Sequence, residues 1–339
     1  MRNTKPPRSL PSCFLLDRLY SRYHRVEFLG SDPLEFPHRY SDPWDREAVA
    51  LLAAVLAYGN VKQIRRSVEA ALERIHRAGQ EAQTSPRAWV AGLSQAEGLT
   101  QARSVFKSFV HRFNGGTDIV ILFGLLSRSW KEHGSLGAHF VSHLDPAAPD
   151  ITVALNGLMA DWRSWLKTDP ALRALARSSP SHSYFLTAPS EGSCCKRWCM
   201  FLRWMGREER GSAHERLDLG LWAPGSELAD KTFPAGKALH PSQLVIPLDT
   251  HTGRISQYIG LTRRKTLNWL AAREVTEALR LCDPQDPTKY DFALARLGIL
   301  SLCRRSYRSE ICSQCDLLEA CRFARKGRAR ELRGARGLA

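Results

Sequence analysis

The sequence predicts an all-α protein, and three observations carry this prediction. Apolar side chains recur at i, i+3, i+4 and i+7 in several segments, which is the spacing of a helix with one buried face. Asp-Pro pairs stand at 42–43 and 286–287, where an acidic N-cap followed by proline typically begins a helix. Strand-like alternation is scarce: Leu217, Leu219 and Leu221 alternate, but over too few residues to build a sheet.

The helices are predicted in chain order from these stripes. The first follows Asp42-Pro43, the second covers 198–205, and the third covers 267–282 and ends at Asp283-Pro284. A fourth starts at Asp286-Pro287. The residues of the four stripes are Val49, Leu52, Ala53 and Leu56; Trp198, Phe201, Leu202 and Met205; Leu267, Leu270, Ala271, Val275, Ala278, Leu279 and Cys282; and Leu294 and Leu297.

Length and composition are those of a globular chain. The 339 residues are 43% hydrophobic and 24% charged, enough for one large or two modest domains. Twenty-three Gly, 18 Pro and nine Trp exclude collagen-like and disordered classes. The longest apolar run, 48–58, has 11 residues, whereas a membrane span needs about 18. We therefore expect no membrane span.

The charge balance points to a polyanionic partner. Forty-nine Lys and Arg against 34 Asp and Glu give a formal net charge of +15, which suits nucleic acid or an acidic membrane surface. The N-terminal apolar stretch 13–16 is too short for a signal peptide. A cytoplasmic, nucleoid-associated protein is expected.

Four of the nine cysteines form a cluster near the end of the chain. Cys303, Cys312, Cys315 and Cys321 fall within 19 residues, with gaps of eight, two and five. This crowding and the expected reducing compartment favour a metal or iron–sulfur centre over a disulfide framework. Because the intervening residues are mostly polar, burial as small hydrophobic side chains is a weak explanation. Structural zinc stays open, but it usually takes two close-spaced pairs, and only one is present here. A [4Fe–4S] cluster is favoured, partly because of the family resemblance described below.

Arginines lie between the first two of these cysteines. Arg304, Arg305 and Arg308 would present guanidinium groups to phosphates from a loop pinned at both ends. The alternative is a solvated surface loop. The net charge of +15 favours the phosphate contact.

Asp249 and Lys196 each allow a structural and a chemical interpretation. Asp249 follows an apolar segment and suits a helix N-cap, where a preorganised carboxylate can also stabilise a cation or move a proton. Lys196 precedes Trp198 by two residues, which places it opposite the buried stripe, facing a cleft or water. A lysine acts as a nucleophile when burial or a nearby cation lowers its pKa, and Arg197 is adjacent in sequence. His251 is expected to serve packing or a supporting hydrogen bond.

Taken together, these segments resemble the helix-hairpin-helix DNA glycosylase superfamily, most closely its endonuclease III-like members. The shared order is a glycine-containing hairpin at 188–192, a helix carrying Lys196, a Leu-Asp-Thr-His run at 248–251 and a terminal cysteine quartet. Residues 45–66 resemble the first barrel helix and its following loop. The runs 248–254 and 289–294 place the likeness closest to an uncharacterised bacterial branch of the superfamily.

The resemblance implies a DNA glycosylase with AP lyase activity. Lys196 would attack the sugar C1′ to form a Schiff base, and Asp249 would activate it. The four clustered cysteines would hold a [4Fe–4S] cluster. The residues implied to contact DNA are Gly192 and Ser193 of the hairpin, together with Arg304, Arg305 and Arg308. The partner would be double-stranded DNA, damaged or abasic, bound by a monomer that flips the target nucleotide out of the duplex.

The implied architecture has two helical domains. Residues 1–44 and 246–325 would form the cluster domain, and 45–245 a helical barrel with the hairpin and an insertion at 206–247, which is functional or partly disordered. Residues 326–339 would be a solvated basic tail.

Two departures from the family pattern keep an alternative open. The usual hairpin sequence Leu-Pro-Gly-Val-Gly is replaced by 190–194, Ser-Glu-Gly-Ser-Cys, which keeps one glycine. In addition, 52 residues separate Lys196 from Asp249, more than the family uses. The alternative is a non-catalytic DNA-binding protein that retains the fold and cluster. An electron-transfer or RNA-modifying protein is the third candidate.

Overall fold

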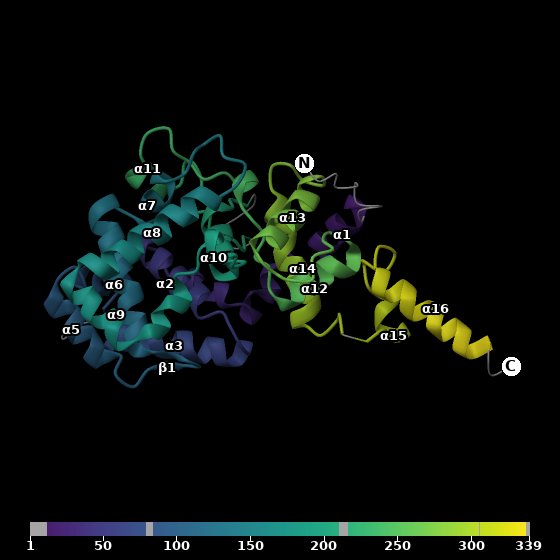
Figure 1. Ribbon diagram of the computed structural model, residues 1–339, viewed down its shortest axis with the longest axis horizontal. Coiled ribbons are helices and arrows are strands. Elements are labelled where there is room, and N and C mark those ends of the chain that lie inside the picture. Colours follow the sequence, from purple (N-terminus) through teal and green to yellow (C-terminus); the bar gives the residue numbers. More distant parts are fainter. Residues whose placement is uncertain (1–11, 79–83, 210–215, 305, 337–339) are drawn as a thin grey trace. The chain divides into compact units, whose positions relative to one another are not determined.

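A computed structural model describes residues 12–78, 84–209, 216–304 and 306–336 (Figure 1). Within these ranges the regular structure is helical apart from one short hairpin, so the prediction of an all-α protein is confirmed. The hairpin pairs β1 (Val110–His111) with β2 (Asn114–Gly115) in antiparallel register. None of the helices in these ranges has the length and apolar character of a membrane span.

The chain divides into two compact units. The first comprises Met1–Arg25, Cys194–Lys196 and Leu244–Ala339, and the second comprises Val26–Ser193 and Arg197–Gln243. Residues 26–44, which the sequence analysis assigned to the cluster domain, belong to the second unit. They do so because the short 3-10 helices at 33–35 and 37–39 bury Leu34 and Phe36 against the helix that follows.

The second unit contains most of the helices. They are α2 (Pro43–Val55), α3 (Val61–Arg77), α4 (Pro86–Gly92), α5 (Ala96–Val105), α6 (Gly116–His133), α7 (Leu136–Ser142), α8 (Thr152–Thr168), α9 (Pro170–Ser178), α10 (Lys196–Gly206, whose first residue belongs to the first unit) and α11 (Glu227–Thr232). Helix α2 starts as predicted, since the Asp42 carboxylate accepts hydrogen bonds from the backbone N–H groups of Trp44 and Asp45. It is buried on nearly every side.

A carboxylate pocket at Glu47 joins α2 to the long connection between α10 and the first unit. Glu47 is fully buried and accepts four hydrogen bonds, from the indole N–H groups of Trp130 (2.6 Å) and Trp222 (2.8 Å) and from the backbone N–H groups of Leu136 (3.0 Å) and Gly137 (3.1 Å). Burial raises the pKa of Glu47 despite these donors. Trp222 lies in the segment 206–247, so this segment contributes at least one fully buried side chain to the core of the second unit.

The first unit is built from α1 (Cys13–Tyr23), α12 (Thr250–Ile259), α13 (Trp269–Arg280), α14 (Asp291–Ile299), α15 (Ser309–Cys312) and α16 (Arg322–Arg336). Helix α14 packs against both α1 and α12. One predicted core position is wrong, because Leu270 is 51% exposed. Asn268 caps α13, so the helix starts at Trp269, and its buried face runs through Trp269, Ala272, Val275, Thr276 and Leu279.

Two further features of the first unit were not predicted. Cys13 of α1 and Cys282, just after α13, form a disulfide across a sequence separation of 269. The expected basic tail is helical through Arg336, because α16 is rich in Arg, Lys and Ala, which favour helix even without burial.

Candidate functional site

Lys196 is the first residue of α10 and is half-buried. The predicted apolar stripe of this helix is confirmed: Trp198, Phe201, Leu202 and Met205 are all buried. The other residues between Trp198 and Gly206 are buried as well, so α10 is enclosed on all sides there and the predicted placement of Lys196 opposite a buried stripe stays a prediction. Its neighbour Arg197 belongs to the second unit, where its guanidinium lies 3.6 Å from the ring centre of Tyr184.

The segment 188–195, which includes the predicted hairpin at 188–192, contains two left-handed backbone positions. Gly192 has φ +75° after a 3-10 turn at Pro189–Glu191, and Cys195 has φ +47°. Left-handed conformation is unusual for a residue with a side chain and costs free energy. Glu191 holds the turn by accepting a hydrogen bond from the Ala188 N–H and pairing with Arg163 at 2.7 Å, which lowers the pKa of Glu191. Gly192 is exposed, and Ser193, the other predicted hairpin contact, is half-buried.

Lys196 and Asp249 belong to the same compact unit, although 52 residues separate them. The Cys194 thiol lies 3.5 Å from the Leu248 carbonyl oxygen. This contact joins the residue two before Lys196 to the residue directly before Asp249.

Asp249 is the N-cap of α12, as its sequence context predicts. Its Oδ1 accepts a hydrogen bond of 2.7 Å from the Thr252 N–H, which orients the carboxylate, and the residue is half-buried. His251 packs on Gly298 so closely that a Cβ there would lie 2.3 Å from its ring. This agrees with the packing role expected for His251.

The four clustered thiols are half-buried and electrostatically coupled. Burial raises the pKa of Cys303 to about 11, and Cys312, Cys315 and Cys321 add to the shift as nearby thiols, while Arg254 opposes it. Burial also raises the pKa values of Cys315 and Cys321. The assignment of these four cysteines as the ligands of a cluster stays a prediction. A metal ion bound there would have to replace the protons of these thiols, because the thiolate is the form that binds metal.

Contacts from three helices hold the cysteine segment, residues 303–321. Arg18 of α1 pairs with Asp316 at 2.9 Å, and Arg254 of α12 donates a hydrogen bond of 3.3 Å to the Cys303 carbonyl oxygen. At the start of α16, the Ala324 N–H donates to the Cys321 sulfur at 3.3 Å.

Basic side chains surround this segment. Arg304 and Arg308 are exposed, whereas the third predicted arginine, Arg305, lies outside the described residues. Helix α16 adds a basic face, whose shallow depression is lined by Arg322, Arg325, Lys326, Ala329, Arg330 and Arg333.

A separate polar cluster in the second unit was missed by the sequence analysis. His139, His143 and Asp161 place one ligand atom each within 4.8 Å of the others. Burial lowers the pKa of His139 to about 4, although the Asp161 carboxylate opposes this shift. Burial tends to raise the pKa of Asp161, but hydrogen bonds from both histidines outweigh it and lower the value. The i, i+4 spacing of the histidines was the available sequence signal, but nothing in the sequence links them to Asp161.

Comparison with known proteins identifies the family. The chain belongs to DUF2400, a family described as proteins of unknown function, whose model matches residues 32–300. The match includes both Lys196 and Asp249 and ends before Cys303. No curated protein matches the chain. No solved structure matches it either.

Proposed function

We propose that the protein is a DNA base-excision glycosylase with AP lyase activity, in which Lys196 is the nucleophile and Asp249 its activator. The supporting observation is that Lys196 shares a compact unit with Asp249, with Cys194 in contact with Leu248. Because Lys196 and Asp249 are far apart in the sequence, the contact between Cys194 and Leu248 is a tertiary contact between their two segments.

The chemistry assigns a role to each side chain. The Lys196 amine attacks C1′ of a flipped nucleotide, the C1′–N bond breaks, and the base leaves with the bonding electron pair. Opening of the sugar then gives a Schiff base, and β-elimination breaks the C3′–O bond. Asp249 takes a proton from the amine and stabilises the cationic sugar. The cap hydrogen bond from Thr252 limits rotation of the carboxylate.

The basic surfaces of the first unit support a DNA partner. Arg304, Arg308 and the cationic face of α16 provide guanidinium and ammonium groups for phosphates. Such contacts are independent of sequence and offset the few kcal/mol that extruding a nucleotide costs.

The cysteine quartet supports the cofactor assignment. Cys303, Cys312, Cys315 and Cys321 would hold a [4Fe–4S] cluster, which would fix the loop that carries Arg304 and Arg308. Zinc is the competing occupant. The purified protein should be brown and contain iron and inorganic sulfide; a colourless protein with stoichiometric zinc would overturn the cluster.

Borohydride trapping on abasic duplex DNA tests the catalytic assignment. The wild-type protein should form a covalent adduct, because the reductant fixes the Schiff base as a stable amine. Lys196→Ala should lose the adduct, and Asp249→Asn should slow its formation by at least about tenfold. Lys265→Ala, which removes an exposed lysine of the same unit, is the matched control and should trap like wild type.

The alternative is a DNA-binding protein without catalysis. The observations that favour it are the altered sequence at 190–194, which keeps one glycine, and the left-handed position of Cys195 directly after it. It holds if wild type gives neither adduct nor abasic product over a panel of damaged bases, yet binds duplex DNA with steep salt dependence.

A further inference from the structure

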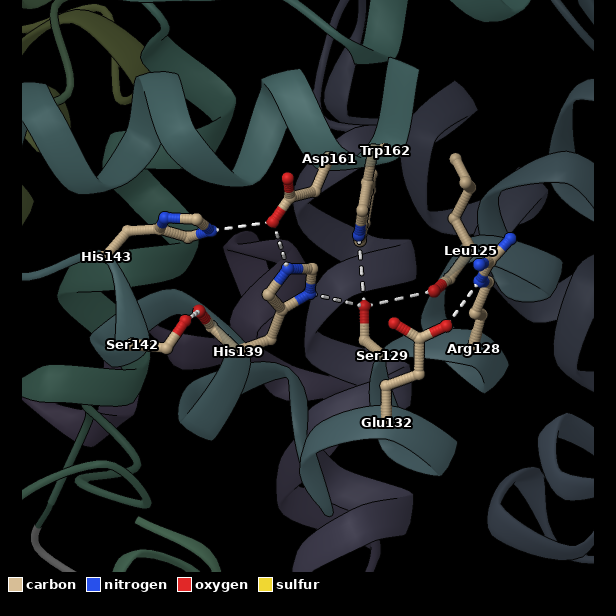
Figure 2. Close-up of polar contacts among 9 residues, drawn as sticks. All are labelled: Leu125, Arg128, Ser129, Glu132, His139, Ser142, His143, Asp161 and Trp162. Carbon is tan, nitrogen blue, oxygen red and sulfur yellow. Dashed lines mark hydrogen bonds and ion pairs between the residues drawn. The ribbon is translucent and has the colours of Figure 1, made fainter. Parts of the chain in front are cut away.

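His139, His143 and Asp161 converge between two helices of the second unit. His139 lies on α7, His143 follows the end of that helix, and Asp161 lies on α8. Both histidines point Nε2 at the same oxygen, Oδ2 of Asp161, at 3.1 Å from His139 and 2.7 Å from His143 (Figure 2). Both imidazole rings therefore point at one carboxylate oxygen.

The helix positions and a glycine on α8 allow the His143 ring to reach Asp161. Spacing of i, i+4 puts the two histidines on one side of α7 and its end. Gly157 of α8 lies against the His143 ring, and a Cβ at that position would be 2.6 Å from ring atoms. A larger residue at 157 would push His143 away from Asp161.

Hydrogen bonds hold the His139 ring in place. The Ser129 hydroxyl lies 3.1 Å from the Leu125 carbonyl oxygen, accepts from the Trp162 indole N–H at 3.0 Å, and lies 3.0 Å from His139 Nδ1 (Figure 2). The hydrogen bond at Nδ1 fixes the ring orientation in which Nε2 points at Asp161.

Both imidazoles approach the same carboxylate oxygen. Nε2 of His139 lies 3.1 Å and Nε2 of His143 lies 2.7 Å from Oδ2 of Asp161. The His139 side chain is fully buried, so the surrounding structure holds its ring in this place. A metal ion bound by the three side chains accounts for the convergence of two imidazoles on one carboxylate.

We propose that His139, His143 and Asp161 bind a divalent transition metal ion of the zinc or ferrous class. Two imidazoles and one carboxylate are the ligands these ions accept, and metal–ligand bonds of about 2.1 Å at right angles put neighbouring ligand atoms about 3 Å apart. The three ligand atoms all lie within 4.8 Å of one another, which is close enough for them to bind one ion. Ser129 acts as a positioning residue because it orients the His139 ring.

The site is open on one side. Side-chain exposure is 42% for Asp161 and 30% for His143, whereas His139 is enclosed. Three protein ligands with one accessible side leave coordination positions for water or an exchangeable anionic ligand, as in metal sites that act on substrates. This inference is independent of the proposed glycosylase activity, since Lys196, Asp249 and the clustered cysteines all belong to the first unit.

Cobalt titration of the metal-depleted full chain tests the site. Co²⁺ bound by nitrogen and oxygen gives visible d–d absorption without the sulfur charge-transfer bands that the cysteine quartet would add, so the two sites are read separately. Wild type should bind one equivalent in the nitrogen–oxygen form, and Zn²⁺ should displace it.

Ligand variants decide the outcome. Asp161→Asn and His143→Ala should each weaken this binding at least about tenfold, and Ser129→Ala should weaken it by about tenfold. His240→Ala, which removes an exposed histidine of the same unit, should bind like wild type. If Asp161→Asn keeps the wild-type unfolding midpoint and still binds Co²⁺ as wild type does, or if wild type shows no nitrogen–oxygen form, the site is refuted.

Discussion

The carboxylate pocket at Glu47 and the cysteine segment 303–321 satisfy buried polar groups in different ways. Around Glu47, two indoles and two backbone amides supply every donor, and the side chain is fully enclosed. In the cysteine segment the thiols are half-buried and have one another as neighbours, and Asp316 and Leu317 are buried beside them. The first region is complete within the chain, whereas in our proposal the order of the second depends on iron.

Replacing a predicted cluster ligand should produce the largest difference between the cysteine segment 303–321 and the Glu47 pocket. Cys315→Ser should abolish the brown colour and iron content and make the segment 303–321 sensitive to protease, because thiolate bonds would no longer hold its polar loop. The second unit should keep its helical signal. Cys194→Ser removes a half-buried thiol of the same unit outside the quartet and serves as the control. Full iron retention in Cys315→Ser would contradict the assignment.

A smaller effect is expected at the self-contained pocket. Glu47→Gln keeps the shape but turns an amide NH₂ toward N–H donors, so it should cost about 3 kcal/mol of unfolding free energy. Urea denaturation followed by tryptophan fluorescence measures it. Glu132→Gln, which loses an exposed i, i+4 pair with Arg128, should change stability by less than about 0.5 kcal/mol. Equal stability of the two variants would show that the Glu47 pocket contributes little.

The smallest effect is expected at a partly exposed ion pair of the first unit. Lys289 lies 2.7 Å from Asp283, with side-chain exposures of 21% and 25%. Burial tends to lower the pKa of Lys289 and raise that of Asp283, but their pairing outweighs both shifts, so the pKa of Lys289 is raised and that of Asp283 lowered. Lys289→Met should therefore cost about 1 kcal/mol near neutral pH.

The pH dependence of the stability difference between wild type and Lys289→Met follows from the pKa shifts of Lys289 and Asp283. The Asp283 contribution is present above its ordinary pKa of 3.8 and is lost as the pH falls through the lower folded value. The Lys289 contribution is present below its ordinary pKa of 10.5 and is lost as the pH rises through the higher folded value. Urea midpoints of wild type and Lys289→Met should converge at both extremes, with the exposed Lys131→Met unchanged throughout. A gap that persists in acid would exclude the ion pair as its cause.

Local chemistry made the helix starts predictable. Asp42 and Asp249 both cap helices as their sequences indicate, because an N-cap depends on a few adjacent residues. The predicted face of α13 was right at Ala271, Val275 and Leu279 and wrong at Leu270, because periodicity alone left the start of the helix open, whereas the Asn268 cap starts it at Trp269. The cysteine quartet was visible because its members are close in sequence.

Features that depend on distant packing were not predictable. The Glu47 pocket needs Trp222, 175 residues away, and the histidine site needs α8 to pack on α7. The hydrogen bonds that position the His139 ring involve Ser129 and Trp162, which no local pattern connects. The Glu47 pocket and the histidine site both depend on tertiary contacts between residues far apart in the sequence. A local sequence pattern can therefore indicate some of the residues of such a site, but not the distant residues that complete it.

The Cys13–Cys282 bond closes a covalent ring that contains every residue of the second unit. While the bond is intact, the chain between Cys13 and Cys282 stays a closed ring when the second unit unfolds. This ring lowers the conformational entropy of the unfolded chain. Reduction would release this restriction without changing any contact of the second unit. The folding of one unit is therefore coupled to the redox state of the other through topology alone.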